Sequence, residues 1–299
     1  MADLASDADR LAELALAEDG PRDVTTELAA DPAAPARGVI EYRSGGVLAG
    51  VPYAEAVATR SGCRVEWAAP EGGVLPPMSS AGVLHGSFGG VLRAERPLLN
   101  MLQRGSGIAN ATRAFVGAVA GTPCRVLHTR KTAPGLRRFD VAAVLAGGGG
   151  RHRLDLAHEV MIKDNHWQAL QRRGVTLATV LEQARARGIT SCQVEVESEE
   201  QLDTACAAGA TRLLIDNQTP ETVRRWAAAA RRRRPGIEIE ATGGITLGNA
   251  RAYAEAGADF ISIGALTHSA QAADLGLEIM AGNAVPRLSR RKTPAPPRE

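Results

Sequence analysis

Residues 192–216, CQVEVESEEQLDTACAAGATRLLID, contain a β-rich run, an amphipathic segment and a second β-rich run. The same alternation continues through the β-rich runs IEIEA (237–241) and DFISI (259–263). Short β-rich runs that alternate with amphipathic helices are typical of a parallel sheet with crossover helices. The fold class that we predict is therefore α/β.

Three further strands are predicted upstream, at RVLHT (125–129), RHRLDL (151–156) and EVMIK (159–163). About seven parallel strands within roughly 150 residues are too many for a small open sheet. We therefore predict an incomplete parallel α/β barrel over residues 111–270.

Residues 1–110 have a different pattern, which predicts an N-terminal α+β domain. RGVIEYRSGGVLAG (37–50) predicts a hairpin around Ser-Gly-Gly, and a helix is expected near residues 51–61. A helix at 95–118 would connect this domain to the barrel. At the other end of the chain we predict a C-terminal helix at 271–285 and a basic, Pro-rich, disordered tail at 286–299.

The composition excludes several classes of protein. Hydrophobic residues make up 44% and charged residues 23%, which excludes disorder for most of the chain. The sequence contains no run of about 18 apolar residues, so no membrane-spanning helix is predicted. The 35 basic and 33 acidic residues nearly balance, at a net charge of +2, so no nucleic-acid-binding surface is indicated.

The location that we predict is cytoplasmic. The N-terminus is acidic and amphipathic, unlike a secretory signal. The four cysteines, Cys63, Cys124, Cys192 and Cys206, are widely spaced and form no C-x-x-C pair, which favours reduced thiols.

The polar residues at the predicted strand ends indicate a site. In an α/β barrel, catalytic groups gather at the carboxyl ends of the strands. The early strands are followed by Arg130, Lys131 and Lys163, and another strand nearby carries His152 and Arg153. The middle strands end at Glu195 and Asp216, and the last two strands end at Thr242-Gly243-Gly244 and Gly264. Glycine turns in that position commonly hold a phosphate on backbone N–H groups. The pattern predicts a site for a polyanion, with a metal ion or sugar hydroxyls in the middle.

Two other kinds of site are not favoured. AGGGGRHR (146–153) lacks the G-x-x-x-x-G-K-[ST] spacing of a nucleotide-triphosphate loop. His152, His158 and Glu159 match none of the zinc-ligand spacings.

Several long motifs, in the same order, closely resemble the nicotinate-nucleotide pyrophosphorylase (carboxylating), or quinolinate phosphoribosyltransferase, family. They are EDGPRDVTTEL, ERPLLNMLQRGSGIANATRAFVGAV, HTRKTAPGLR, GGGGRHR, MIKDNH, VEVES, LLIDN and EATGGITLGNARAYAEAGADFISIGALTHS. The resemblance covers about residues 10–280. It implies an open, sandwich-like N-terminal domain with an incomplete barrel, assembled as a homodimer or higher homo-oligomer. It also implies synthesis of nicotinate mononucleotide from quinolinate and phosphoribosyl pyrophosphate, with release of pyrophosphate and CO2 and with Mg2+ as cofactor.

The resemblance implies a role for each candidate residue. Quinolinate would contact Arg130, His152, Arg153 and Lys163, together with Arg96 from the neighbouring subunit. The phosphoribosyl pyrophosphate would contact Lys131, Glu195, Asp216, Thr242, Gly243 and Gly264. Among these, Lys131, Glu195 and Asp216 would be catalytic, and Glu195 and Asp216 would hold Mg2+ directly or indirectly.

The chain departs from the family at Arg151 and Asp155, where Asn and Gly are common. If residues 151–156 form a strand, Arg153 and Asp155 share a face and can pair. The alternative is that Asp155 turns toward Arg151 or toward solvent. Two alternatives stay open. One is a related phosphoribosyltransferase that acts on another aromatic carboxylate. The other is a Schiff-base lyase with Lys163 or Lys131 as nucleophile.

Overall fold

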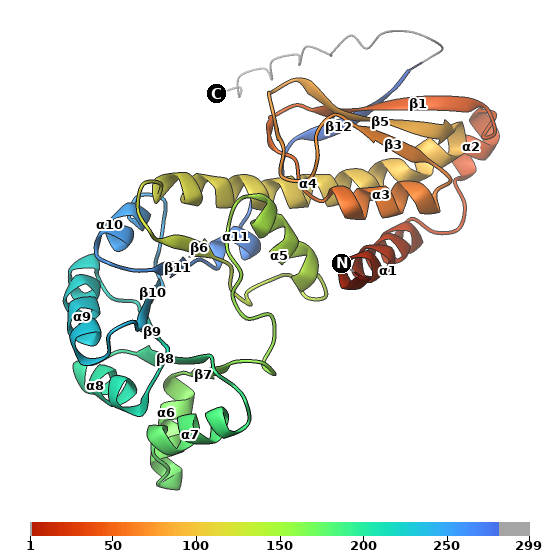
Figure 1. Ribbon diagram of the computed structural model, residues 1–299. Helices are drawn as coiled ribbons and strands as arrows, with labels where there is room; N and C mark the ends of the chain where they lie inside the picture. Colours follow the sequence, from red (N-terminus) through yellow and green to blue (C-terminus); the bar gives the residue numbers. More distant parts are fainter. Residues whose placement is uncertain (1, 281–299) are drawn as a thin grey trace, which may run out of the picture. The chain divides into compact units, whose positions relative to one another are not determined.

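The computed structural model describes residues 2–280, which divide into two compact units (Figure 1). The first unit contains residues up to Gly107 and those from Gln271 onward, and the second contains Ile108–Ala270. The division lies inside one long helix, α4 (Phe88–Ala118), which begins earlier than the predicted helix at 95–118. Our sequence boundary, between 110 and 111, lies in the same helix.

The first unit is built on a four-stranded antiparallel sheet of order β12-β1-β5-β3. Figure 1 shows α3 and α4 against one face of this sheet, and their apolar side chains share a core with Ile40, Tyr42 and Leu84 from the strands. Besides α4, its elements are α1 (Ala2–Glu18), α2 (Val24–Ala29), β1 (Pro35–Tyr42), β2 (Gly46–Val47), α3 (Val51–Arg60), β3 (Arg64–Trp67), β4 (Val74–Leu75), β5 (Ser79–Ser87) and β12 (Leu275–Met280).

The predicted hairpin at 37–50 is wrong. β1 pairs with β5 and β12, whereas β2 pairs with β4 in a separate two-stranded sheet. The Ser-Gly-Gly segment therefore takes the chain from one sheet to another.

The predicted helix at 271–285 is also wrong where the structure describes it, because residues 275–280 form β12. Leu275, Leu277 and Ile279 alternate with other residues and pack against the core of the first unit, which is the period of a strand. Residues 281–285 and the predicted disordered tail at 286–299 lie outside the described residues.

The second unit is built on a six-stranded parallel sheet of order β6-β11-β10-β9-β8-β7. Figure 1 shows α8, α9 and α10 along the outer side of this curved sheet. The unit contains β6 (Arg125–Leu127), α5 (Arg137–Ala146), β7 (Val160–Ile162), α6 (Asp164–Arg173), α7 (Leu177–Ala186), β8 (Cys192–Val196), α8 (Glu199–Ala208), β9 (Arg212–Asp216), α9 (Pro220–Arg233), β10 (Glu238–Thr242), α10 (Ala250–Glu255), β11 (Phe260–Ser262) and α11 (Ala265–His268).

Alternate side chains of these strands point to opposite faces of the sheet. Val194, Leu213 and Ile239 belong to the apolar core that the strands form with the helices. On several strands, the residues between these core residues are polar. In the paired strands, Leu214 on β9 lies opposite both Glu195 on β8 and Glu240 on β10. The inner face of the sheet therefore carries charged side chains such as Glu195 and Glu240.

The strand predicted at 151–156 is not formed. Gly150 makes a single parallel bridge to Leu127, and residues 151–154 form no ladder. The chain then bends at Asp155, whose carboxylate accepts a hydrogen bond from the Ala157 N–H. The six strands and this bridge make the incomplete α/β barrel that was predicted, with one strand fewer than expected.

Within residues 2–280, no helix combines the length and apolar composition that a membrane crossing requires.

The start of α3 depends on a carboxylate from a distant loop. Both oxygens of Glu71 accept backbone hydrogen bonds, from Gly50 N–H at 3.1 Å and Val51 N–H at 2.9 Å. Gly50 lies at φ 91° and has no side chain that could cap the helix, so Glu71 satisfies N–H groups that would otherwise lack partners.

We predict that Glu71→Ala lowers the free energy of unfolding by about 1–2 kcal/mol, since a helix cap and two hydrogen bonds are lost. Urea unfolding measures this loss. Glu55→Ala, an exposed position on the same helix, should change stability by less than about 0.5 kcal/mol. Equal effects of the two substitutions would contradict the capping role.

Candidate active site

A cavity of about 710 Å³ lies at the carboxyl ends of the parallel strands of the second unit. The sequence-predicted residues that line it are Arg130, Lys131, His152, Arg153, Lys163, Glu195, Asp216, Thr242 and Gly243. The topology of the sheet therefore brings together residues that are up to about 110 positions apart, as expected at this end of a barrel.

One wall of the cavity is basic. Arg130 is half-buried, and its Nε atom is buried without a hydrogen-bond partner in the described structure. Burial lowers the pKa of Arg153, and the nearby charge of Arg130 lowers it further. Two guanidinium groups that repel each other in a half-buried wall are stabilised by an anion between them.

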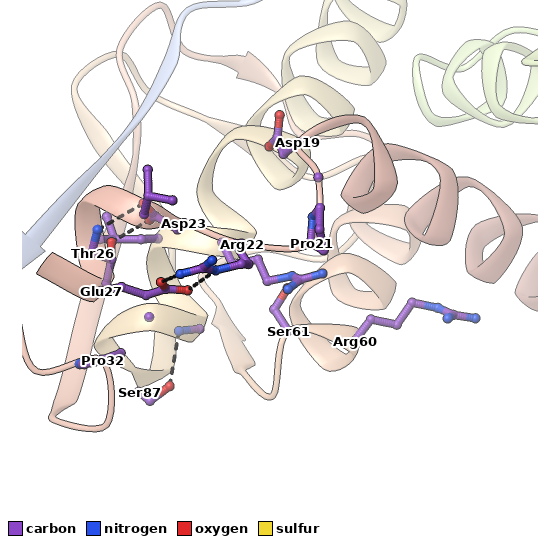
Figure 2. A pocket seen from close by; sticks show the side chains of 16 residues that line it. Asp19, Pro21, Arg22, Asp23, Thr26, Glu27, Pro32, Arg60, Ser61 and Ser87 are labelled. Carbon is purple, nitrogen blue, oxygen red and sulfur yellow. Dashed lines mark hydrogen bonds and ion pairs between the residues drawn. The ribbon is translucent and has the colours of Figure 1, made fainter.

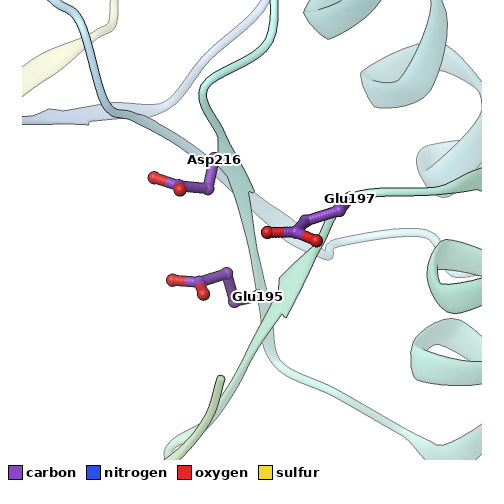
Figure 3. A group of neighbouring side chains, drawn as sticks. All are labelled: Glu195, Glu197 and Asp216. Atoms are coloured by element: carbon purple, nitrogen blue, oxygen red, sulfur yellow. The ribbon is translucent and has the colours of Figure 1, made fainter. Parts of the chain in front are cut away.

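The opposite side is acidic, and Figure 3 shows its three carboxylates, Glu195, Glu197 and Asp216. Ligand oxygens from all three lie within 4.8 Å of one another. Burial and then the charge of Glu195 raise the pKa of Asp216. Lys163 forms an ion pair with Glu195. A set of converging carboxylate oxygens suits a hard divalent cation such as Mg2+.

In the turn after β10, Gly243 has no room for a side chain. Gly243 lies at φ 80°, and a Cβ there would be 2.1 Å from Asn217 Oδ1. Asn217, itself at φ 51°, donates a hydrogen bond to Asp216 at 2.6 Å. Gly243 thus allows the contact that orients Asp216, while the backbone of the turn faces the cavity.

Gly264 is not among the residues that line the cavity. A Cβ at this position would be 2.8 Å from Lys131 Cδ, so the glycine leaves space for the lysine side chain. Thr267 Oγ1 also donates to the Lys131 carbonyl at 2.8 Å. The geometry gives Gly264 a role in placing Lys131, and its predicted contact with a phosphate stays a prediction.

Two histidines lie behind the basic wall. His128 is fully buried, and its Nε2 accepts a hydrogen bond from the His152 backbone N–H at 3.0 Å. Its Nδ1 lies 3.2 Å from the Thr129 carbonyl oxygen, which it can reach only as a donor. Burial lowers the pKa of His128 to about 4, so the ring is neutral at pH 7.

Of the two alternatives for Asp155, the structure does not show the pairing with Arg153. The two residues lie in a loop rather than on a strand, and Asp155 Oδ1 instead contacts the Ala157 N–H at 2.8 Å and His158 Nδ1 at 2.9 Å. These two contacts lower the pKa of Asp155, which is fully exposed.

Arg96 lies on α4 in the first unit, where its side chain is exposed. Its predicted contribution to the site of a neighbouring subunit stays a prediction.

The first unit contains a cavity of its own, of about 890 Å³ (Figure 2). The segment Asp19–Glu27, which is part of the motif EDGPRDVTTEL, lines this cavity. The end of α3 and the start of α4 line it as well. Asp23 caps α2 through Thr25 and Thr26 N–H, and Arg22 pairs with Glu27. No sequence prediction identified this cavity.

Sequence reasoning missed several residues of the site in the second unit. Glu197 and Asn217 line the cavity beside Glu195 and Asp216, and Glu240 lies on its inner side. Glu197 follows Glu195 by two positions on the same face of the chain, which is a signal that could have identified it. Glu240 gives no such signal, since it precedes the strand end.

Comparison with known proteins agrees with the site. The family model for the quinolinate phosphoribosyl transferase N-terminal domain matches residues 23–106, and the model for its C-terminal domain matches 108–278. The chain belongs to the quinolinate phosphoribosyltransferase family. Its two matched segments meet within α4, close to the division between the two units.

Relatives of this family cover most of the chain. The nicotinate-nucleotide pyrophosphorylase [carboxylating] of Rattus norvegicus is 38% identical over 256 residues, or 85% of each chain. The enzyme of the same name from Mycobacterium leprae is 37% identical over 86% of this chain and 91% of its own length. The solved nicotinate-nucleotide pyrophosphorylase of Francisella tularensis superposes with a TM-score of 0.85 at 30% identity, and covers 92% of this chain and 97% of its own.

We predict that His128 makes stability depend on pH. Its pKa is about 4 in the folded chain and near 6.5 when unfolded, so the unfolded state takes up the proton first as the pH falls. The stabilisation is present above about pH 6.5 and is lost as the pH falls towards 4, by about 3 kcal/mol at most. Thermal unfolding of the native protein and of His128→Gln across this range measures it. A pH dependence that is identical in the two proteins would contradict this assignment.

Proposed function

We propose that this chain transfers the phosphoribosyl group of phosphoribosyl pyrophosphate to quinolinate, with decarboxylation, to give nicotinate mononucleotide for NAD biosynthesis. The observation that carries the proposal is the division of one cavity into a wall with two guanidinium groups, of which Arg130 has an Nε without a partner in the described structure, and a carboxylate cluster. A dianionic aromatic acid matches the first, and a sugar diphosphate with its metal ion matches the second.

Quinolinate binds at the basic wall in this proposal. Forked guanidinium groups bind planar carboxylates through paired hydrogen bonds, which suits Arg130 and Arg153. Lys163 also lines the cavity, where it pairs with Glu195. Burial of the wall excludes water and strengthens the contacts that orient the pyridine nitrogen.

The carboxylates act on the sugar. As the bond to diphosphate breaks, an oxocarbenium-like ribose develops, and Glu195 and Asp216 stabilise its positive charge and orient its hydroxyls. Lys131 meets the charge that develops on the leaving diphosphate. When bound by Glu195, Glu197 and Asp216, Mg2+ supplies further charge neutralisation for that diphosphate. The ribosylated pyridinium then accepts the electron pair that loss of CO2 leaves behind.

A Schiff-base lyase is less well supported by this geometry. Such an enzyme needs a neutral, desolvated lysine as nucleophile. Lys163 instead forms an ion pair with Glu195, and its side chain is 41% exposed, so it is not desolvated. Another aromatic carboxylate as substrate remains the second candidate, because the loop at Asp155 departs from the family.

Assembly as a homodimer with a shared site, and a cytoplasmic location, belong to the same proposal. The exposed side chain of Arg96 supports the first, since it is available to a second copy. The four free, buried cysteines agree with a reducing compartment.

The proposal is tested by incubating the protein with quinolinate, phosphoribosyl pyrophosphate and Mg2+ and measuring nicotinate mononucleotide. Formation of product with release of CO2 supports it. Turnover of another aromatic carboxylate, with none of quinolinate, would favour the second candidate.

We predict that Arg130→Ala lowers kcat/KM for quinolinate by about two to four decades, because a desolvated carboxylate loses its partner at about 3–5 kcal/mol. The KM for phosphoribosyl pyrophosphate should change little. Arg172→Ala, an exposed position on α6 outside the cavity lining, is the matched control. Equal losses for both substrates would refute the assignment of Arg130 to quinolinate.

We also predict that mixing two inactive variants, Arg96→Ala and Lys163→Ala, restores activity. In a dimer with shared sites, each heterodimer contains one site with both native residues, so random exchange gives about a quarter of native activity. Subunit exchange is verified by native mass spectrometry. If exchange occurs without recovery, each site is built from a single chain.

A further inference from the structure

The inner side of the cavity contains a buried ion pair that the proposed chemistry does not use. Glu240, on β10, is 1% exposed, and its Oε2 accepts a hydrogen bond from Arg212 Nη1 at 3.0 Å. Arg212, at the start of β9, also donates through Nε to Glu238 at 2.8 Å, and its guanidinium lies 4.1 Å from the centre of the Phe260 ring. Two carboxylates and an aromatic ring therefore fix the arginine.

The other oxygen of Glu240 faces His152. Its Oε1 has no aligned hydrogen bond in the described structure but lies 3.3 Å from His152 Nε2, and the His152 side chain is 7% exposed. The Arg153 backbone N–H donates to His152 Nδ1 at 2.7 Å. Because Nδ1 is an acceptor, the proton of the neutral ring is on Nε2, beside the carboxylate. Both ring nitrogens then have partners inside the protein.

The backbone at these positions is held as well. The His152 N–H donates to His128 Nε2 at 3.0 Å, and His128 Nδ1 contacts the carbonyl of Thr129. His152 therefore connects the loop that carries Arg153 to the end of β6, where Arg130 follows Thr129. The distance between the two guanidinium groups depends on this connection.

We propose that the Arg212–Glu240 pair is a positioning device for the substrate carboxylates. By holding His152 with its proton on Nε2, it fixes the backbone that presents Arg153 beside Arg130. His152 is then a positioning residue, and its predicted contact with quinolinate stays a prediction. Carboxylates orient metal-binding histidines in the same way. The inference rests on the proposed function, since it assigns the two arginines to that substrate.

Glu240→Gln tests the proposal with almost no change of shape. The Gln oxygen still accepts from Arg212, but its NH2 group then meets the N–H of His152, and two donors cannot bond to each other. We expect the KM for quinolinate to rise roughly 10- to 100-fold, with little change in the KM for phosphoribosyl pyrophosphate.

Glu238→Gln is the matched control, because it removes the other carboxylate of the same arginine two positions along the same strand. Glu238 is 46% exposed, and its loss should leave the KM for quinolinate unchanged. If Glu240→Gln does not fold, Arg212→Lys, which keeps the charge but loses the forked geometry, should give the same selective rise.

A substrate-free measurement separates this inference from the proposed function. Nitrogen-15 NMR of the free protein should show His152 with its proton on Nε2 in the native chain and in Glu238→Gln, and a changed tautomer in Glu240→Gln. If the native chain does not use quinolinate, the proposed function fails, while the spectra still decide the state of His152. An unchanged tautomer in Glu240→Gln, or an equal rise of both KM values, would overturn the positioning role.

Discussion

Each parallel strand of the second unit must satisfy two environments, because successive side chains point to opposite faces. Val194 and Leu213 face the helices and form the core, while Glu195 and Arg212, their neighbours in sequence, face the inside of the barrel. A charge in that interior is stable only with a partner or a ligand. The active site depends on this alternation, since the residues that hold the fold together and those that bind substrate lie on the same short strands.

Sequence patterns predicted the elements whose signal is local. β8, β9, β10 and β11 were identified because each apolar run is followed by an amphipathic helix. Residues 151–156 also alternate, but they form no strand, and the Asp155 carboxylate accepts a hydrogen bond from the Ala157 N–H in a bend. Residues 275–280 were assigned to a helix, because nothing nearby in the sequence shows that β1 offers them an open edge.

The candidate site was predictable in part for a similar reason. Residues at the carboxyl end of a parallel strand share one edge of the sheet, so Lys163, Glu195 and Asp216 could be grouped before the structure was known. Glu240 and His128 act from behind that edge. Their contacts depend on which strands are neighbours and in which register, and neither is contained in a local pattern.

The position of β12 has a consequence for synthesis on the ribosome. β1 emerges early and pairs with β5, but its second edge stays open until residues 275–280 arrive, after the whole second unit has been made. An open strand edge is a template for pairing with other chains. The unit that begins first is thus completed last, and a fragment that stops at Gly107 would expose that edge permanently.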